Sequence, residues 1–210
     1  AFAVPVFLFV SGAFLAYAAR EFSATFVRNS LERILWPYLL WSGIFYTLMY
    51  VGAGTLESPA SYAKHLLVGY PYHFVPLLVF WYLVTPAVAR VGQRHGLTFV
   101  VAIGAWQLWL MAVREPAMFG LEGVLPAWTR ATAPPVLANT MADWGVFFPL
   151  GFVMSLHGNT VKPRLEHWRG VAAALAAALF CLGLLNAASV VPAPWARLVA
   201  PLPVMFVLPT

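Results

Sequence analysis

The sequence predicts an all-α membrane protein, a polytopic bundle of transmembrane helices. Hydrophobic residues make up 62% of its 210 residues, whereas charged residues make up only 9%. A soluble domain carries about a quarter charged residues, so most of the outer surface of this chain is expected to contact lipid. Apolar runs of spanning length recur between polar breaks. Because a backbone in lipid must satisfy its own hydrogen bonds, these runs are predicted to be α-helices.

The apolar runs predict six full transmembrane helices and part of a seventh. The seventh starts at about residue 198 and has too few apolar residues to cross a bilayer. The first run begins at Ala1 with no methionine or basic leader, so we expect the sequence to be a fragment of a larger protein. The full helices are predicted at residues 2–19, 34–54, 73–91, 97–113, 138–157 and 170–191.

The lysines and arginines are distributed unevenly over the breaks between these helices. Eight of the 12 lie in the breaks at 20–33, 90–96 and 158–169, and the other four lie in the opposite breaks. Basic residues favour cytoplasmic loops, so these three breaks are predicted to face the cytoplasm. The net charge of +5 follows from the same bias. We therefore expect the lipid bilayer as a partner and no nucleic acid.

The predicted outer loop at 114–137 is long for a simple connection. Its sequence, REPAMFGLEGVLPAWTRATAPPVL, combines prolines with apolar residues. An ordered lid or re-entrant segment and an exposed flexible loop are equally compatible with this composition.

The chain carries none of the short motifs that mark metal sites or activated nucleophiles. HExxH, GxSxG, GxxxxGK[ST] and GxGxxG are all absent from the sequence, as are cysteine or histidine clusters at zinc spacing. We expect no bound metal and no tightly bound cofactor. Any chemistry must therefore use scattered side chains that the bundle brings together.

Three polar residues inside the predicted helices are candidates for lining a polar cavity. Ser11 precedes Gly12, and the favoured interpretation is that this small pair permits close contact between helices. Gln107 and Asn186 lie in the middle of predicted spans, where interhelical hydrogen bonds are the more common role.

Among the five histidines, His73 is the best candidate for proton transfer. It opens the predicted helix 73–91 among tyrosines at the outer face, where an imidazole that anchors the helix is the favoured alternative. His65 lies beside Lys64 and is expected to be solvated. His157 ends a predicted helix, and interaction with the helix C-terminus is a sufficient explanation for it.

Arg28 and Arg33 lie in the break at 20–33, just before an apolar run. As interface anchors they would bind anionic lipid headgroups, each contributing about 1 kcal/mol. Arginine also suits bidentate binding of phosphate, as in a nucleotide-like cofactor. Composition alone favours the anchor.

Four segments, in this order, resemble helices of the acyltransferase-3 family of bacterial membrane acyltransferases. They are PVFLFVSGAFL, FVRNSLERILWPYLLWS, YHFVPLLVFWYLVTPAV and WGVFFPLGFVMS. Their order, spacing and orientation agree with the family over most of the chain. The resemblance implies that residues 1–210 are part of an inner-membrane protein with roughly ten spanning helices.

The resemblance also implies an activity. Members of the family transfer an acyl group, often acetyl, from acyl-coenzyme A to a hydroxyl of a sugar in an envelope polysaccharide or glycolipid. Arg33 matches the second arginine of the family's Arg-x-x-Arg element. Ser30 occupies the position of the first arginine, and Arg28 is the candidate to replace that missing arginine. The catalytic histidine of the family would precede Ala1, so the chain is expected to be inactive alone.

A membrane transporter that exports a glycan or a small metabolite is the alternative function. Both functions require polar residues within the membrane. A histidine on the helix that precedes Ala1 would favour the enzyme, and its absence would favour the transporter.

Overall fold

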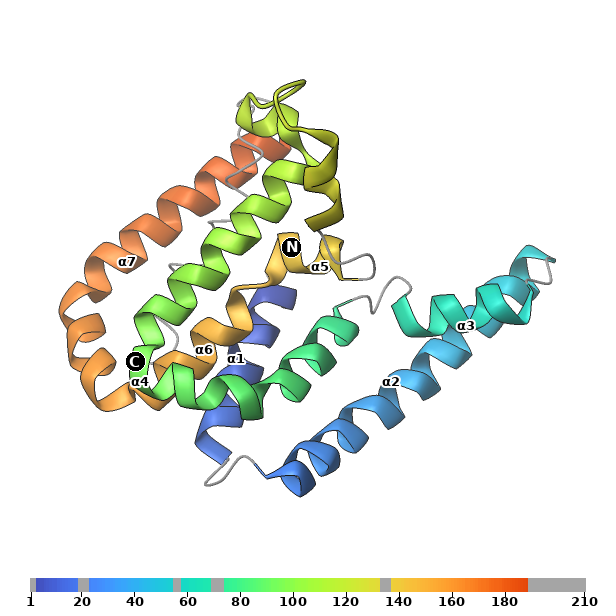
Figure 1. The fold of residues 1–210 in the computed structure, drawn as a ribbon, viewed down its shortest axis with the longest axis horizontal. Helices are drawn as coiled ribbons and strands as arrows, with labels where there is room; N and C mark the ends of the chain where they lie inside the picture. Colours follow the sequence, from blue (N-terminus) through green and yellow to red (C-terminus); the bar gives the residue numbers. More distant parts are fainter. Residues whose placement is uncertain (1–2, 19–22, 55–57, 69–73, 133–136, 189–210) are drawn as a thin grey trace.

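The computed structural model describes residues 3–18, 23–54, 58–68, 74–132 and 137–188, and the secondary structure in these ranges is helical throughout (Figure 1). The all-α class predicted from the sequence is therefore confirmed. The helices are α1 (Ala3–Ala18), α2 (Ala24–Ala53), α3 (Pro59–Val68), α4 (Val75–Arg114), the 3-10 helices η1 (Pro116–Phe119) and η2 (Ala127–Thr132), α5 (Ala138–Trp144), α6 (Phe147–Leu156) and α7 (Gly158–Ala187).

Two of the charged breaks are largely helical, which corrects the predicted boundaries. Helix α2 begins at Ala24 rather than 34, and α7 begins at Gly158 rather than 170. Both extensions carry an ion pair one turn apart, Arg28–Glu32 at 2.8 Å and Lys162–Glu166 at 4.0 Å, as suits an exposed helix. The length of an apolar run therefore marks the apolar segment of a helix and not the whole helix, which continues into charged sequence.

Ser23 fixes the start of α2. Its hydroxyl oxygen accepts a hydrogen bond from the backbone N–H of Phe26 at 3.2 Å, which is N-cap geometry. At the other end Gly54 adopts a left-handed conformation with φ of 64° and donates to the carbonyls of Tyr50 and Val51.

The predicted helices 73–91 and 97–113 are the two halves of α4, and the predicted break between them is a sharp bend. Only His95 has non-helical dihedral angles, with φ of −133° and ψ of 42°. Figure 1 shows that the two halves run in different directions from this bend. Gly96 allows α6 to pack against the bend, since a Cβ there would lie 2.6 Å from Cγ1 of Val153.

The predicted helix 138–157 is divided into α5 and α6, and Gln107 of α4 holds the junction. Its amide nitrogen donates to the carbonyl of Asp143 at 3.2 Å, and its amide oxygen accepts from the N–H of Val146 at 2.7 Å. These backbone groups flank the break in the helix, where intrahelical partners are missing. Gln107 therefore forms interhelical hydrogen bonds, the role favoured from the sequence.

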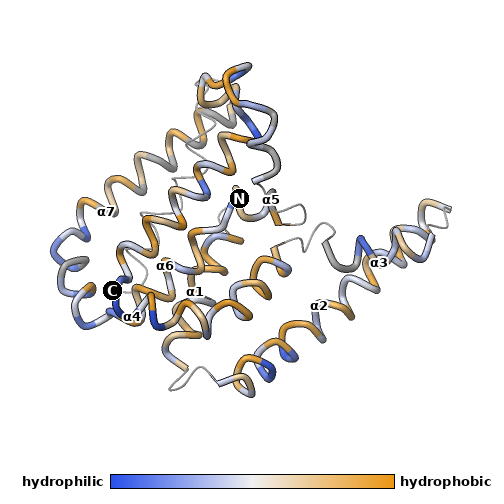
Figure 2. Tube along the Cα trace, in the orientation of Figure 1, coloured by the Kyte–Doolittle hydropathy of each residue, from blue (hydrophilic) through white to orange (hydrophobic). Residues whose placement is uncertain are grey.

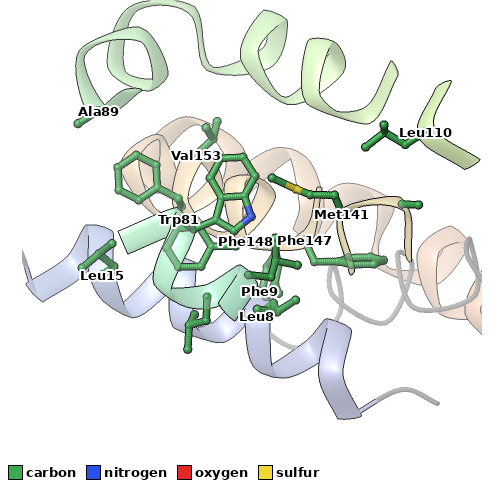
Figure 3. Close-up of a cluster of buried hydrophobic side chains, with 14 of the residues drawn as sticks. Leu8, Phe9, Leu15, Trp81, Ala89, Leu110, Met141, Phe147, Phe148 and Val153 are labelled. Atoms are coloured by element: carbon green, nitrogen blue, oxygen red, sulfur yellow. The ribbon is translucent and has the colours of Figure 1, made fainter. Parts of the chain in front are cut away.

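The core forms where α1 and α6 meet (Figure 3). A Cβ on Gly12 would overlap the carbonyl oxygen of Phe148, and one on Gly151 would overlap that of Phe9, so the two backbones are in direct contact. Trp81 of α4 stacks on Phe148 with ring planes 4° apart. The buried apolar cluster around this contact includes Leu8, Phe9, Leu15, Leu77, Trp81, Leu110, Met141, Phe147, Phe148 and Phe152.

Charged residues gather where the helices turn, at the lower edge of Figure 1. The end of α1, the start of α2, the bend of α4 and the start of α7 all lie along this edge, and hydrophobic stretches run between the turns (Figure 2). We call it the basic edge, defined by Arg28, Arg33, Arg90, Arg94 and Lys162, all of which are exposed. Among the described residues, α2 and α4 are long and apolar enough to cross a membrane, and α1 and α6 are shorter apolar helices.

The connection after α4 is folded over residues 115–132, which favours the ordered alternative over a flexible loop. The 3-10 helices η1 and η2 lie against α4, and Trp109 Nε1 donates to the hydroxyl of Thr132 at 3.0 Å. Helix α3 was not predicted, and it packs against α2. The predicted seventh helix from about residue 198 lies outside the described residues.

Replacement of Gly151 by alanine should lower the free energy of unfolding by about 1–3 kcal/mol, because the added methyl forces the backbones of α1 and α6 apart. Thermal unfolding in detergent, followed by tryptophan fluorescence, measures the change. Gly170→Ala on α7 is the matched control, since its Cβ meets nothing within 4 Å. Equal melting temperatures for the two variants would contradict the close contact.

Gln107→Leu should also lower the free energy of unfolding, by about 1–3 kcal/mol, because it removes the two hydrogen bonds that the Gln107 amide makes to the backbone of Asp143 and Val146. Gln93→Leu, on the same helix but exposed, is the control. A melting temperature for Gln107→Leu that matches this control would show that the junction does not need the amide.

Candidate functional site

A groove lies between α1, α6 and the first turns of α7. Its volume is about 610 Å³, within the range of small-molecule sites. Phe9 and Ala13 of α1 and Met154 of α6 form an apolar part. Ser155, Asn159 and Lys162 give the rest a polar lining. The groove can therefore accept an amphipathic ligand.

The turn from α6 into α7 shapes this groove. His157 ends α6, and its carbonyl accepts hydrogen bonds from the N–H groups of Thr160 and Val161, both at 2.9 Å. Helix α7 then runs back away from the basic edge (Figure 1). Gly158, at the turn, also lines the groove, and a Cβ there would meet nothing within 4 Å. The groove is therefore open beside the start of α7.

Lys162 and Glu166 place opposite charges on the lining. Their side chains are 4.0 Å apart and more than half exposed. An ion pair of this kind contributes about 0–1 kcal/mol, so Lys162 can turn toward another anion at little cost.

The structure places the two predicted phosphate-binding arginines on the first turns of α2. Arg28 donates from Nε to Glu32 at 2.8 Å, and this hydrogen bond together with the attraction between the charges raises the pKa of the Arg28 guanidinium. Arg33 is exposed and has no ion pair within the described ranges. The two positions are about 140° apart around the helix, so they project in different directions.

His157 has a role that the sequence did not reveal. Its Nε2 donates to the backbone carbonyl of Gly92, just before the bend of α4, at 2.9 Å. A Cβ on Gly96 would lie 2.9 Å from the same nitrogen. His157 therefore ties the end of α6 to the bend of α4, in addition to ending its own helix.

His65 is half-buried against α2, which corrects the expectation that it is solvated. Its ring stacks on Tyr46, with centroids 5.5 Å apart and planes 17° apart, and its Nδ1 is hydrogen-bonded to the hydroxyl of Tyr50. The hydroxyl of Tyr62 donates to the carbonyl of Gly43 at 3.1 Å. Tyrosines four residues apart in α2 were the available signal, because they share one helix face.

Of the remaining predicted site residues, the structure describes Ser11 in full. Ser11 is half-buried on α1 beside Gly12, where α1 meets α6, which supports its interpretation as part of a close helix contact. Asn186 lies on α7, and its side chain and the whole of His73 lie outside what the structure describes. Within the described ranges, no three histidine, cysteine or acidic side chains form a group that could hold a metal ion.

Comparison with known proteins identifies the family. The chain matches the model of the acyltransferase-3 family, described as an acyltransferase domain, over residues 1–209. It therefore belongs to this family, and the resemblance seen in its four segments is confirmed. No curated protein and no solved structure matches the chain.

Proposed function

We propose that this protein is an integral membrane enzyme that transfers an acyl group, in the simplest case acetyl, from acyl-coenzyme A to a hydroxyl of a sugar or an envelope polysaccharide. The observation that carries the proposal is the family match over residues 1–209, because the matched domain is an acyltransferase. The same match favours the enzyme over a transporter.

The proposed setting is the bacterial inner membrane, which the protein would cross several times, and the exposed apolar surface supports a membrane protein. Large apolar side chains are exposed along α2, including Trp36, Trp41 and Leu48. Such extensive exposed apolar surface is unfavourable in water and marks contact with lipid or protein. The helices alternate in direction between the basic edge and the opposite edge (Figure 1), as successive membrane spans do.

The basic edge would face the cytoplasm, where acyl-coenzyme A is found. Arginine binds phosphate through two parallel hydrogen bonds. Arg33 is exposed, which supports the proposal that it binds the donor's phosphates. Arg28 contributes less, because its guanidinium is already bonded to Glu32. Acyl-coenzyme A is a substrate here, with no tightly bound cofactor.

The reaction exchanges one acyl bond for another. The hydroxyl oxygen of the acceptor attacks the carbonyl carbon of the thioester, a C–O bond forms and the C–S bond breaks. The hydroxyl proton passes to a base and then to the departing thiolate, which leaves as free coenzyme A. A histidine suits this role because it exchanges a proton near neutral pH.

Arg33→Ala should raise the KM for acetyl-coenzyme A about tenfold, since it removes a charge-assisted contact to phosphate. The rate of label transfer from acetyl-coenzyme A to envelope glycan is measured in membranes that contain the protein expressed from its complete gene. Gln93→Ala, an exposed and uncharged site near the bend of α4, is the control. Immunoblots of the membranes should show equal amounts of both variants.

An unchanged transfer rate of Arg33→Ala at a low donor concentration would exclude Arg33 from donor binding. Absence of transfer by the wild-type protein, together with glycan export that depends on the gene, would instead favour the transporter.

A further inference from the structure

We infer that the groove between α1, α6 and α7 binds the acyl-pantetheine arm of the donor, and that its apolar part limits the length of the acyl chain. This inference rests on the proposed function, since it assigns a site to the donor of that reaction. Neither Arg28 nor Arg33 lines this groove.

The lining of the groove matches the chemistry of such an arm. An acyl-pantetheine thioester has an apolar end and a stem with amide groups that donate and accept hydrogen bonds. The groove offers Phe9, Ala13 and Met154 to the apolar end. Ser155 and Asn159 have side chains that can bond to amides. Sites of this kind combine apolar walls with a few polar groups that fix the orientation of the ligand.

The position of the groove fits a donor that arrives from the cytoplasm. Asn159 and Lys162 of its polar lining come from the start of α7, which lies at the basic edge (Figure 1). Ala13 and Phe9 lie progressively further from the end of α1 at that edge. A ligand that entered beside Gly158 would therefore direct its apolar end toward the interior of the bundle.

The charges on the lining predict how the affinity is set. Lys162 is a point charge on a flexible stem and suits the phosphate next to pantetheine. Glu166 lines the same groove and is only 4.0 Å from Lys162, so it opposes an anionic ligand. The two side chains should therefore act in opposite directions on donor binding, which a merely structural ion pair would not do.

The first experiment fills the groove at its open side. Gly158→Leu should raise the KM for acetyl-coenzyme A about tenfold, with a smaller change in kcat, because the new side chain occupies space that the donor needs. Gly170→Leu is the matched control, because it adds the same side chain to the same helix, also into open space and away from the groove. The control should keep the wild-type KM.

The second experiment changes the charges. Binding of coenzyme A is measured by calorimetry on the purified protein in nanodiscs of neutral phosphatidylcholine. Lys162→Gln should weaken binding and Glu166→Gln should strengthen it, each about three- to tenfold. Arg169→Gln, an exposed charge on α7 outside the groove, should leave the affinity unchanged.

The third experiment reduces the space in the apolar part of the groove. Ala13→Leu should lower kcat/KM for butyryl-coenzyme A about tenfold more than for acetyl-coenzyme A, since the longer chain needs the space that the new side chain takes. Ala18→Leu, an exposed position on the same helix, is the control and should leave this ratio unchanged.

The outcomes separate the inference from the proposed function. Acyl transfer by the wild-type protein, with Gly158→Leu, Lys162→Gln and Ala13→Leu all behaving as their controls, would overturn the groove assignment and leave the function intact. Absence of transfer and of coenzyme A binding by the wild type would overturn both.

Discussion

Gly12 and Gly151 let the backbones of α1 and α6 touch, and the rest of the packing is arranged around that contact. A side chain at either position would overlap a carbonyl oxygen of the other helix. Phe148, whose carbonyl oxygen lies at this contact, also stacks its ring on Trp81 of α4, so the contact is continuous with the packing of α4. The same contact fixes one wall of the groove, since Phe9 and Gly151 both line it. Small residues have this role in membrane bundles, where lipid gives no hydrophobic drive for helices to associate.

Two polar side chains then hold the irregular points of the bundle. Gln107 supplies hydrogen bonds to the backbone at the junction of α5 and α6, and His157 bonds to the carbonyl of Gly92 beside the bend of α4. In an apolar environment a backbone group without a partner is costly, so both breaks in regular helix depend on a side chain from a neighbouring element. Helix α6 and the region of α4 from Gly92 onward are thereby fixed relative to each other.

The length and polarity of the apolar runs were sufficient to predict the all-α class and the approximate positions of the long apolar helices, although α3 was missed. The order of four short segments was sufficient to predict the family. The bounds of α2 and α7 could not be found in this way, because Arg28, Glu32, Lys162 and Glu166 are good helix formers that mark the limit of apolar sequence and not of helix. The groove and the stacking of His65 on Tyr46 depend on how separate helices meet. Spacing within one helix, such as that of the tyrosines on α2, indicates which residues share a face but not which element packs against that face.

The bond from Gln107 to the α5–α6 junction has a consequence for the order in which the bundle can be assembled. Gln107 is synthesised before Val146, so its amide is already present when the junction leaves the ribosome. Helix α1 is made earlier still. The face of α1 that carries Gly12 cannot pack against α6 until more than half of the 210 residues have been synthesised after it. During synthesis α1 is therefore present well before α6, and one wall of the groove exists only after α6 has been made.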